Sequence, residues 1–450
     1  AVKRSYGYDR TGNLTHSTDQ RTGTTKFEYD KLGRITQAGN ELFAFDPAHN
    51  ILSDGLNAIP DNRLKTYNGT TYYYDELGNL IHRELADGEV QNYFYDLHDQ
   101  LVKAEIFKKD GTKETWSYTY DALGRRIGKG RLKDSQEVSD DLSNQTRFVW
   151  EGSHLLQEIH PDGRYTYIYT DPDSYEPLAQ IRDWTTKDGK KRQQTHYFHC
   201  DQIGIPREMT DKDGNLLWFG NYTGWGRLKE ETKVTDSAYQ PFRLQNQYAD
   251  HETGLHYNFF RYYEPDAGRF VNQDPIGLMG GDNFYHFAPN ILKWIDALGW
   301  SRWTKTEVLG RRVYKNDTLF TPTRKVSWKD ATSPTGYKCG TNLDRMCEGM
   351  APIGKDGKSV ELHHLTQQEV LRNGKRGSLA EVSWTIHTKY TAILHIPFPR
   401  NPNKRSQTLP RFPSFRRNND GTPSTLAAEF DNYRSAYWKE RAKDFGRTCD

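Results

Sequence analysis

Aromatic and apolar residues alternate with polar ones along much of the first 300 residues of the chain. In Thr115–Tyr120, for example, every second residue is aromatic, and this period of two predicts a β-strand with one packed face. An Asp-x-x-Gly turn follows, in which Asp can bond its own backbone and Gly accepts a positive φ. Since an apolar residue then starts the next stretch, the pattern predicts one β-hairpin after another.

This hairpin unit recurs along the chain. Copies begin at Tyr8, Tyr29, Tyr74 and Tyr120, and degenerate copies begin at Phe45 and Tyr95. The tyrosines at 8, 29, 74, 95 and 120 are separated by 21, 45, 21 and 25 residues, and Phe45 divides the longest interval. Repeated hairpins make a long sheet, whose edges are usually managed by closure or by spiral continuation. A fibre-like or adhesive sheet is an alternative that the periodicity leaves open.

The repeat units and four later stretches resemble the YD repeats of Rhs proteins, teneurins and the C components of Tc toxins. The later stretches are Tyr197–Arg207, Asn221–Gly226, Arg243–Tyr248 and Gly254–Tyr263. The likeness covers about two thirds of the chain. It implies a mostly β fold in which a YD-repeat β-spiral, residues 1–260, forms a hollow shell (cocoon) around a C-terminal polypeptide.

A near-duplicate motif follows the repeats. Asp274–Leu278 reads DPIGL, and Asp296–Trp300 reads DALGW. Together with Pro265–Phe270 and Gly280–Tyr285, these motifs resemble the terminus of the Rhs core. The resemblance implies that residues 261–300 form an autoprotease segment.

In the Rhs family, two aspartates cut the chain after the second copy of this motif, and an upstream arginine assists them. Carried over by position, these residues are Asp274, Asp296 and Arg261. The cut then falls between Trp300 and Ser301. Two carboxyls held close together do not both ionise readily, so one can act as an acid while the other activates water. Because Ala297 and Trp300 replace the family's proline and leucine, we expect a looser turn at the cut.

Length and hydropathy limit the possible protein classes. At 450 residues the chain exceeds what a single hydrophobic core usually fills, so two or more domains are expected. It has no run of eighteen apolar residues and its mean hydropathy is -0.93, which argues against a membrane span. Because the chain opens at Ala1 inside a repeat, we expect it to be a fragment without its N-terminal domains.

The chain has four cysteines, Cys200, Cys339, Cys347 and Cys449. This number is too small for a disulfide framework, which favours synthesis in a reducing compartment. Cys339 and Cys347 can pair, but buried thiols are the expectation.

Charge divides the chain into two parts. Residues 301–450 hold 27 Lys and Arg against 15 Asp and Glu, whereas residues 1–300 hold 35 against 45. The net charge of +2 conceals this asymmetry. A basic C-terminal domain, residues 301–450, suits a polyanion such as nucleic acid, although a solvated basic surface is the alternative.

The basic part contains adjacent histidines at a predicted strand end. His363 and His364 follow Ser359–Leu362, and His387 and His395 lie downstream. Adjacent residues of a strand point to opposite sides, so one histidine can bind a metal while the other faces substrate. From their residue types and spacing, we expect His363 to be a metal ligand, His364 to be the general base, and His387 and His395 to be the remaining ligands. A structural zinc site that uses Cys339 or Cys347 is the alternative.

A longer pattern around these histidines resembles the LHH group of HNH/endonuclease VII nucleases, which are toxin tips of polymorphic bacterial effectors. It comprises Gly354–Leu365, Ala380–Val382, His387 and Phe430–Lys439, within about residues 345–445. The resemblance implies a small α+β domain with a ββα-metal core, in which His364 is the base and His363 and His387 hold one divalent ion, Mg²⁺ or Zn²⁺. Thr391 stands where related sites have a third histidine, so water or Glu381 is the alternative to His395.

Four arginines near this pattern are candidate phosphate contacts. They are Arg411, Arg416, Arg417 and Arg434. Arginine binds phosphate oxygens well, but arginines near proline-rich loops are often simply solvated. The sequence therefore offers these four arginines as candidate nucleic-acid contacts.

Both resemblances together imply a bacterial Rhs effector in competition between bacteria, whose shell releases a metal-dependent DNase. An RNase or tRNase toxin of the same architecture and a non-catalytic, teneurin-like adhesive protein are the alternatives. The resemblance further implies a cognate immunity protein, a type VI spike protein, and an adaptor chaperone that acts through the missing N-terminus. It implies synthesis in the bacterial cytoplasm, type VI secretion, and action on DNA in the target-cell cytoplasm.

Overall fold

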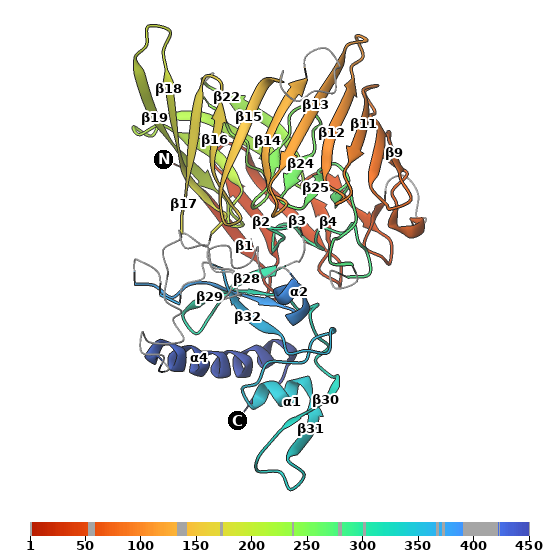
Figure 1. The fold of residues 1–450 in the computed structure, drawn as a ribbon, viewed down its shortest axis with the longest axis vertical. Coiled ribbons are helices and arrows are strands. Elements are labelled where there is room, and N and C mark those ends of the chain that lie inside the picture. The colour runs from red at the N-terminus through yellow and green to blue at the C-terminus, as the bar shows by residue number, and fades with distance from the viewer. Residues whose placement is uncertain are drawn as a thin grey trace. The chain divides into compact units, whose positions relative to one another are not determined.

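The structure is a computed structural model that describes residues 2–52, 59–132, 142–171, 174–235, 238–277, 281–299, 303–365, 369–370, 374–389, 422 and 424–449. The chain divides into two compact units, Ala1–Arg302 and Trp303–Asp450. Strands make up most elements, and the α-helices of the described residues lie in the second unit (Figure 1). The predicted mostly β class, with an α+β C-terminal part, is confirmed. Among the described residues, no helix combines the length and the apolar character needed to span a membrane.

In the described part of the first unit, fifteen consecutive strands form one antiparallel sheet. Each strand pairs with the strands before and after it in sequence, from β8 at one edge to β22 at the other. This is the series of hairpins that the repeat predicts. The strands are β8 (Thr66–Tyr67), β9 (Thr70–Tyr74), β10 (Leu80–Glu84), β11 (Val90–Tyr95), β12 (Leu101–Phe107), β13 (Lys113–Tyr120), β14 (Arg126–Leu132), β15 (Leu142–Glu151), β16 (His154–His160), β17 (Gly163–Tyr169), β18 (Pro177–Thr185), β19 (Lys191–Cys200), β20 (Pro206–Thr210), β21 (Leu216–Tyr222) and β22 (Leu228–Lys233).

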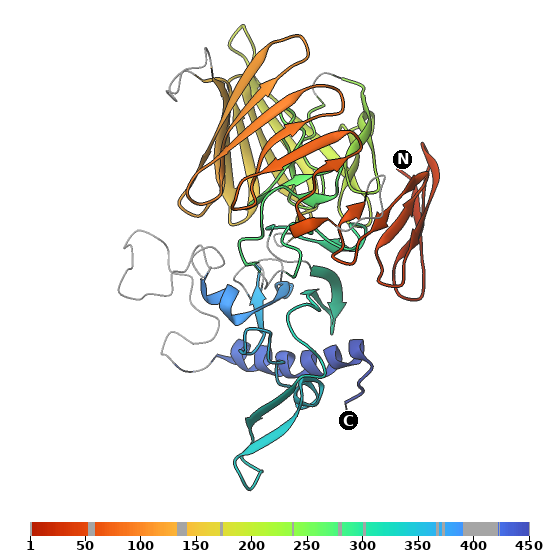
Figure 2. The same ribbon diagram turned by 90° about the vertical axis from the view of Figure 1, so that its right-hand side faces the viewer.

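Smaller sheets complete the first unit. Strands β1 to β5 form a sheet beside the large one (Figure 2), and Arg4 of β1 donates to Glu208 of β20 at 2.7 Å. Strands β6 and β7 pair with each other, and β23 to β26 form a further sheet. The elements are β1 (Arg4–Tyr8), β2 (Leu14–Asp19), β3 (Gly23–Tyr29), β4 (Ile35–Ala38), β5 (Glu41–Leu42), β6 (Ala44–Phe45), β7 (Ile51–Leu52), η1 (Pro60–Asn62), β23 (Tyr248–Ala249), β24 (His256–Asn258), β25 (Arg261–Glu264), β26 (Arg269–Phe270) and β27 (Trp294–Ile295).

The Asp-x-x-Gly turns have the conformation that the sequence predicts. After β1, the Asp9 carboxylate accepts from the backbone N–H groups of Thr11 and Asn13 at 2.8 and 2.9 Å. Gly12 in this turn has a φ of 79°. The hydrogen bond from the Asn13 N–H is the main reason why the pKa of Asp9 is lowered to about 2. The same backbone bonds recur at Asp121.

The repeated tyrosines make a hydrogen bond that the sequence did not predict. The hydroxyl of Tyr95, at the end of β11, donates to the carbonyl of Leu80 at the start of β10, at 3.0 Å. Tyr120 donates to Leu101 of β12 in the same way, at 2.7 Å. These units are thereby tied to the strand before them by a hydroxyl that phenylalanine lacks. Equivalent bonds are made by Tyr29, Tyr169 and Tyr222.

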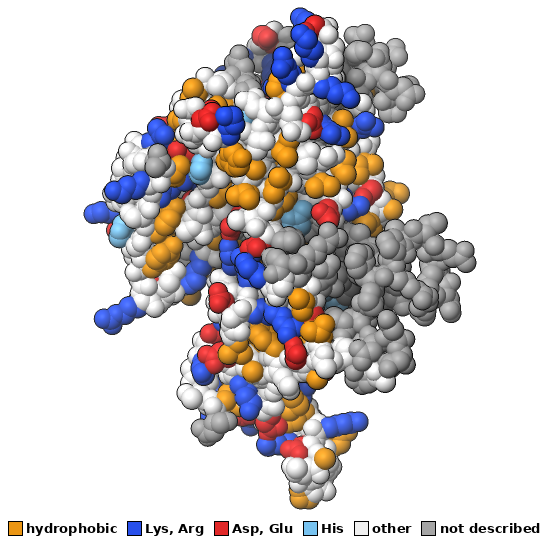
Figure 3. Space-filling view, turned by 90° about the vertical axis from the view of Figure 1, so that its left-hand side faces the viewer, with side chains coloured by type: hydrophobic (Ala, Val, Ile, Leu, Met, Phe, Trp, Pro, Cys, Tyr) orange, Lys and Arg blue, Asp and Glu red, His pale blue; other side chains and the backbone are white. Residues whose placement is uncertain are grey.

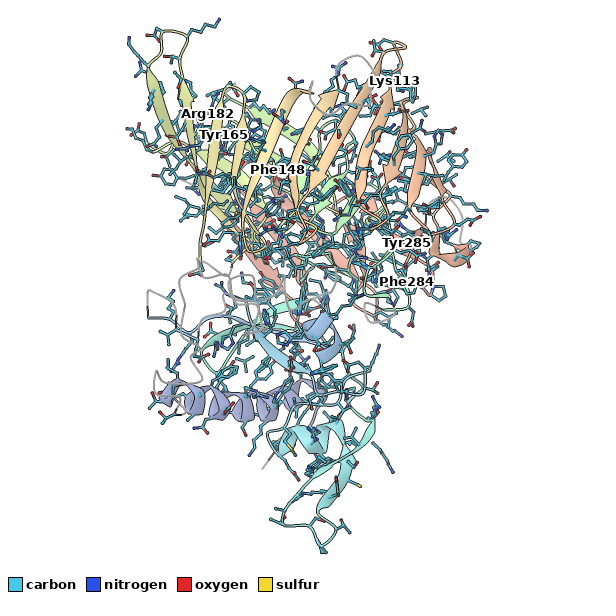
Figure 4. The ribbon with its side chains drawn as sticks, viewed as in Figure 1. Lys113, Phe148, Tyr165, Arg182, Phe284 and Tyr285 are labelled. Atoms are coloured by element: carbon cyan, nitrogen blue, oxygen red, sulfur yellow. A yellow bond between two sulfur atoms is a disulfide. The ribbon has the colours of Figure 1, made fainter. Side chains whose placement is uncertain are left out.

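The packed face of the large sheet contacts the segment around β23 through ion pairs and rings. Arg126 and Lys129 of β14 donate to Asp250 at 2.5 and 3.0 Å. Burial alone raises the pKa of Asp250, but the two cations outweigh it and lower that pKa. Phe148, labelled among the strands in Figure 4, packs edge-on against Tyr248 with 5.2 Å between ring centroids. The solvent-exposed surface differs from this packed face: charged and apolar side chains intermingle on the surface shown in Figure 3.

The second unit contains a short mixed sheet with the strand order β28–β29–β33–β32. Strand β29 pairs parallel with β33, and the other two pairs are antiparallel. Helix α4 runs along this sheet (Figure 1), and its Trp438 joins Val313 and Leu379 in the hydrophobic core. The elements are β28 (Trp303–Val308), β29 (Arg311–Lys315), β30 (Lys325–Lys329), β31 (Tyr337–Thr341), α1 (Asn342–Cys347), β32 (Glu361–His364), β33 (Leu379–Val382), α2 (Trp384–Lys389), α4 (Thr425–Ala442) and η4 (Lys443–Phe445).

A disulfide joins Cys347 of α1 to Cys449, with 5.0 Å between the Cα atoms. The expectation of buried, unpaired thiols at Cys339 and Cys347 is therefore wrong, because Cys347 is bonded to Cys449 and Cys339 is exposed. The bonded cysteines are 102 residues apart in sequence, so tertiary packing of the C-terminal segment against α1 brings them together. Since disulfides are typical of oxidising environments, the low cysteine count does not by itself argue for a reducing compartment.

Candidate active sites

The β32–β33 hairpin and α2 form a ββα segment that carries the predicted site histidines of the described residues. His363 of β32 lies opposite Ala380 of β33, and α2 begins two residues after β33 ends. Asp356, from the turn before β32, accepts from the N–H and the hydroxyl of Thr385 at 3.0 Å each. This carboxylate satisfies a donor in the first turn of α2. The Gly-x-Asp-Gly string thus positions the helix that carries His387.

His363 and His387 face each other, as two ligands of one metal must. His363 Nδ1 lies 3.0 Å from His387 Nε2. Two imidazole nitrogens on one tetrahedral Zn²⁺, at about 2.0–2.1 Å from the ion, lie roughly 3.3 Å apart, so the pair fits a shared divalent ion. Glu361, two residues before His363 on the same strand face, is in ion-pair contact with the other ring nitrogen of His387, Nδ1. Such a carboxylate commonly orients a metal-binding histidine.

Among the described residues, the candidate metal ligands that come together are the ring nitrogens of His363 and His387. Within the described ranges, no group of three or more His, Cys, Asp or Glu side chains comes together as a metal site. The alternative zinc site with Cys347 is wrong, because that sulfur is bonded to Cys449. His395, the third predicted ligand, lies outside the described residues.

Glu381 does not complete the metal site, and that expectation is wrong. Its carboxylate accepts from the N–H of Asn316 at 2.7 Å, from the hydroxyl of Tyr437 at 2.7 Å and from Arg441 at 2.8 Å. Glu381 pairs with Leu362, whose side chain belongs to the hydrophobic core. Since paired residues share a sheet face, Glu381 lies on the core side of the sheet, away from the face of His363.

His364, the predicted general base, packs against α4, whereas His363 faces His387 of α2. Its Nε2 lies 2.6 Å from Glu369 Oε2, and its ring centroid lies 4.6 Å from that of Phe430 on α4. Arg311 donates to both oxygens of Glu369, at 3.1 and 3.0 Å. Burial on its own raises the pKa of Glu369, but the hydrogen bonds from His364 and Arg311 outweigh it, so this pKa is lowered.

Of the candidate phosphate contacts, Arg434 is described. It lies on α4, its side chain is 40% exposed, and it pairs with Asp431 at 3.3 Å. A surface pair of this kind contributes little to stability, so a phosphate can compete for the guanidinium. Outside the described residues lie Arg411, Arg416 and Arg417.

In the first unit, the three predicted self-cleavage residues come together. Arg261 Nη2 lies 3.2 Å from Asp274 Oδ2 and 3.2 Å from Asp296 Oδ2. Because both distances share one nitrogen, the two oxygens are at most 6.4 Å apart. The three side chains are between 1% and 6% exposed, and the guanidinium carbon lies 3.5 Å from the ring centroid of Phe270. One cation thus compensates one of two neighbouring negative charges.

The second copy of the motif forms a turn next to this cluster. Asn258 donates to the carbonyl of Asp296 at 2.9 Å, and Asn246 donates to that of Ala297 at 2.5 Å. Gly299 has a φ of 65°, and a Cβ there would meet the Asn258 carbonyl oxygen at 2.8 Å, so this position needs glycine. Two asparagines therefore hold the turn that lacks the family's proline. Trp300 and Ser301 lie outside the described residues.

Three residues of the histidine site were not predicted from the sequence. Glu361 had a signal, because it precedes His363 by two residues and must share its strand face. Glu369 and Arg311 had no signal in the sequence, because the pairing of β29 with β33 brings Arg311 close to Glu369 and His364. Their contact with His364 depends on tertiary structure.

Among known proteins, double-stranded DNA deaminase toxin A of Burkholderia cenocepacia (strain H111) is 37% identical over 316 residues, which cover 66% of this chain and 22% of that protein. Probable deoxyribonuclease RhsA of Dickeya dadantii is 28% identical over 317 residues, 66% of this chain and 21% of that protein. The chain thus spans about a fifth of the length of these relatives. The crystal structure of TcdB2-TccC3-TEV matches 66% of this chain and 18% of its own chain, with 17% sequence identity and a TM-score of 0.39.

Family models match both units. Residues 8–42 match the RHS repeat and residues 195–232 the RHS protein model. Residues 341–444 match a nuclease of the HNH/ENDO VII superfamily with conserved LHH, and this match includes the whole ββα segment. The chain therefore contains RHS sequence in its first unit and carries, at its C-terminal end, a nuclease domain of the LHH group of the HNH/ENDO VII superfamily.

Proposed function

We propose that the chain is the C-terminal part of a bacterial RHS effector that delivers a metal-dependent endonuclease into competing bacteria. The repeats, residues 1–260, form a hollow shell, residues 261–300 cut the chain after Trp300, and residues 301–450 degrade target-cell DNA. The observation that carries the nuclease part is the 3.0 Å approach of His363 to His387 on a ββα segment within the LHH match.

In the nuclease, the two facing nitrogens of His363 and His387 hold one divalent ion, Mg²⁺ or Zn²⁺. Such an ion supplies stabilisation of the charge on the scissile phosphate and on the leaving oxygen. His364, the last residue of β32, takes the proton of the attacking water as the general base. Arg434 contributes a positive charge to the phosphate backbone, and His395 and the three arginines outside the described residues are further candidate contacts.

The test is plasmid cleavage by the full chain. Supercoiled DNA is incubated with the protein and Mg²⁺ or Zn²⁺, with EDTA in a parallel sample, and an RNA substrate is offered alongside. We expect nicked and linear DNA with metal, and a loss on the order of 10²-fold or more in His364→Ala. His98→Ala, the same change at an exposed histidine of the first unit, should cut normally. Intact DNA with the unmutated chain contradicts the proposal, and cleavage of RNA alone makes the toxin an RNase.

Self-cleavage rests on the cluster of Arg261, Asp274 and Asp296. Arg261 compensates one carboxylate, and repulsion between the two carboxyls still favours one shared proton. The protonated carboxyl donates to the leaving amide, while the ionised one activates water at the Trp300–Ser301 bond. The hydrogen bonds of Asn258 and Asn246 to the turn fix the approach to that bond.

A denaturing gel tests this step. The unmutated chain should give fragments of 300 and 150 residues, and Asp274→Asn should give one band of full length. Asp266→Asn, a change at an aspartate whose side chain is 48% exposed, should leave both fragments. A single band from the unmutated chain contradicts the proposal.

The proposed life cycle involves partners beyond DNA. The effector is made in the bacterial cytoplasm, where a cognate immunity protein covers the toxin. An adaptor chaperone and a type VI spike protein engage segments N-terminal to this chain, and the toxin acts in the target-cell cytoplasm. Support comes from relatives that are named toxin and deoxyribonuclease. Co-purification of a small neighbouring-gene product with residues 301–450 tests the immunity partner.

A further inference from the structure

Two histidines of the nuclease site, His364 and His387, each contact a glutamate on the ring nitrogen that the proposed chemistry does not use. We propose that Glu369 is the positioning residue of the general base: it holds His364 in the tautomer with the proton on Nε2, so that Nδ1 accepts the proton of the attacking water. This inference rests on the proposed nuclease function and adds residues to it that the LHH motif does not contain.

Glu369 is itself held in one orientation. Arg311 donates Nη1 to Oε1 at 3.1 Å and Nη2 to Oε2 at 3.0 Å, a two-pronged contact that prevents rotation of the carboxylate. The Nε of Arg311 donates to the Gly377 carbonyl at 2.5 Å, and Arg376 donates to Glu369 Oε1 at 3.1 Å. Both Arg311 and Glu369 have side chains that are 2% exposed. The acceptor for His364 is therefore fixed before substrate binds.

The imidazole of His364 is held from a second direction. Its ring packs against Phe430 of α4 at 4.6 Å between centroids, and Phe430 also lies 5.5 Å from the guanidinium of Arg311. The carboxylate at 2.6 Å and the ring of Phe430 together restrict rotation of the imidazole. Phe430 belongs to the α4 pattern that the sequence marked without a role, and this contact supplies one.

The chemistry follows from the donor and acceptor properties of the pair. An ionised carboxylate only accepts hydrogen bonds, so the ring nitrogen that faces Glu369 must carry a proton. In the neutral imidazole the lone pair is then on Nδ1. When Nδ1 takes the proton of water, the hydroxide that remains attacks phosphorus and the P–O bond to the leaving oxygen breaks. The proton passes from His364 to solvent or to the leaving oxygen, and Glu369 stabilises the positive ring in between.

Glu361 gives a contrast within the same site. It contacts Nδ1 of His387, whose Nε2 faces His363, so it acts on a metal ligand and not on the base. Changes at Glu361 should therefore weaken metal binding, by roughly 10–100-fold. Changes at Glu369 should leave metal affinity the same and reduce turnover.

The first experiment measures the tautomer in the unmutated full chain without metal. Nitrogen-15 NMR of a histidine-labelled sample, with His364 assigned by its loss in His364→Ala, should show the proton on Nε2. A proton on Nδ1 overturns the inference whether or not the protein cuts DNA. If the tautomer is as expected but the unmutated chain cuts neither DNA nor RNA, the proposed function fails instead.

The second experiment is a double-mutant cycle on plasmid nicking. Glu369→Gln should lower the rate on the order of 10²-fold with an unchanged metal affinity by calorimetry, and should have no further effect in a His364→Ala background. Glu429→Gln is the matched control, because Glu429 is 52% exposed and contacts the same Arg376. Equal losses with and without His364 would assign Glu369 a purely structural role. Should Glu369→Gln not fold, Glu369→Asp, which keeps the charge, should retain part of the rate.

Discussion

The two units are stabilised by different kinds of contact. The first unit repeats one small set of contacts: an aspartate in many of its turns, as at Asp9 and Asp121, and a tyrosine hydroxyl that bonds to the previous strand in several units, as at Tyr95. The second unit uses each of its contacts once. Glu381 collects three donors in its interior, and one disulfide joins α1 to the C-terminal end.

This difference bears on where each candidate site is vulnerable. In a repeat structure, stability is approximately a sum over neighbouring units, so the loss of one contact stays local. In a small single-core unit, one lost contact is felt throughout, because the whole unit unfolds cooperatively. The histidine site should therefore respond to distant changes in its unit far more than the Arg261 cluster does in the first unit.

The largest expected effect is loss of the disulfide. Cys347→Ser with Cys449→Ser opens a closure of 102 residues, and we expect the unfolding free energy of the second unit to fall by about 4 kcal/mol. Hydrogen exchange read by mass spectrometry should show the loss in residues 303–449 and not in the first unit. Cys339→Ser, at an exposed free cysteine, is the control. An equal loss of protection in both units would remove the contrast between them.

A smaller but still large effect is expected at Glu381. Glu381→Gln leaves the buried Arg441 with less compensating charge, although Asp444 still pairs with it at 2.9 Å. We expect a loss of about 3 kcal/mol in the second unit, measured by urea unfolding. Glu440→Gln, at a pair whose side chains are about half exposed, should change stability by less than about 0.5 kcal/mol. A change at Glu381 as small as that of the control would show that the buried network contributes little.

The same contrast explains what the sequence predicts. The hairpins, the Asp-x-x-Gly turns and the meeting of Arg261, Asp274 and Asp296 follow from local pattern and family resemblance. The sequence did not predict residues whose role depends on tertiary contact. Glu369 contacts His364 and is itself held by Arg311 of β29, and Cys449 is bonded to Cys347, which is 102 residues away in sequence. Glu381 was misassigned because its position between the two histidines in sequence conceals that it faces the core.

An intermediate effect is expected from acid. The pKa of Glu369 is lowered in the folded state, so its ionised form stabilises the second unit above its unfolded pKa of about 4.3. That contribution is lost as the pH falls through the lower folded pKa. Glu369→Gln should therefore destabilise the unit by about 2 kcal/mol at neutral pH, and the difference from the unmutated chain should shrink below pH 4. A difference that stays constant down to pH 2 would mean that the carboxylate charge is not involved.

The smallest effect should be the most local. Tyr95→Phe removes the hydroxyl that donates to Leu80 at 3.0 Å and should cost about 1 kcal/mol, seen as faster hydrogen exchange in β10 and β11 alone. Tyr73→Phe, at a tyrosine that is 46% exposed on the adjacent β9, should leave exchange unchanged. Because the equivalent bonds of other units remain, strands beyond the neighbours should keep their protection. Faster exchange throughout the large sheet would show that the repeats unfold as one cooperative block, and the two units would then differ in architecture but not in how they distribute stability.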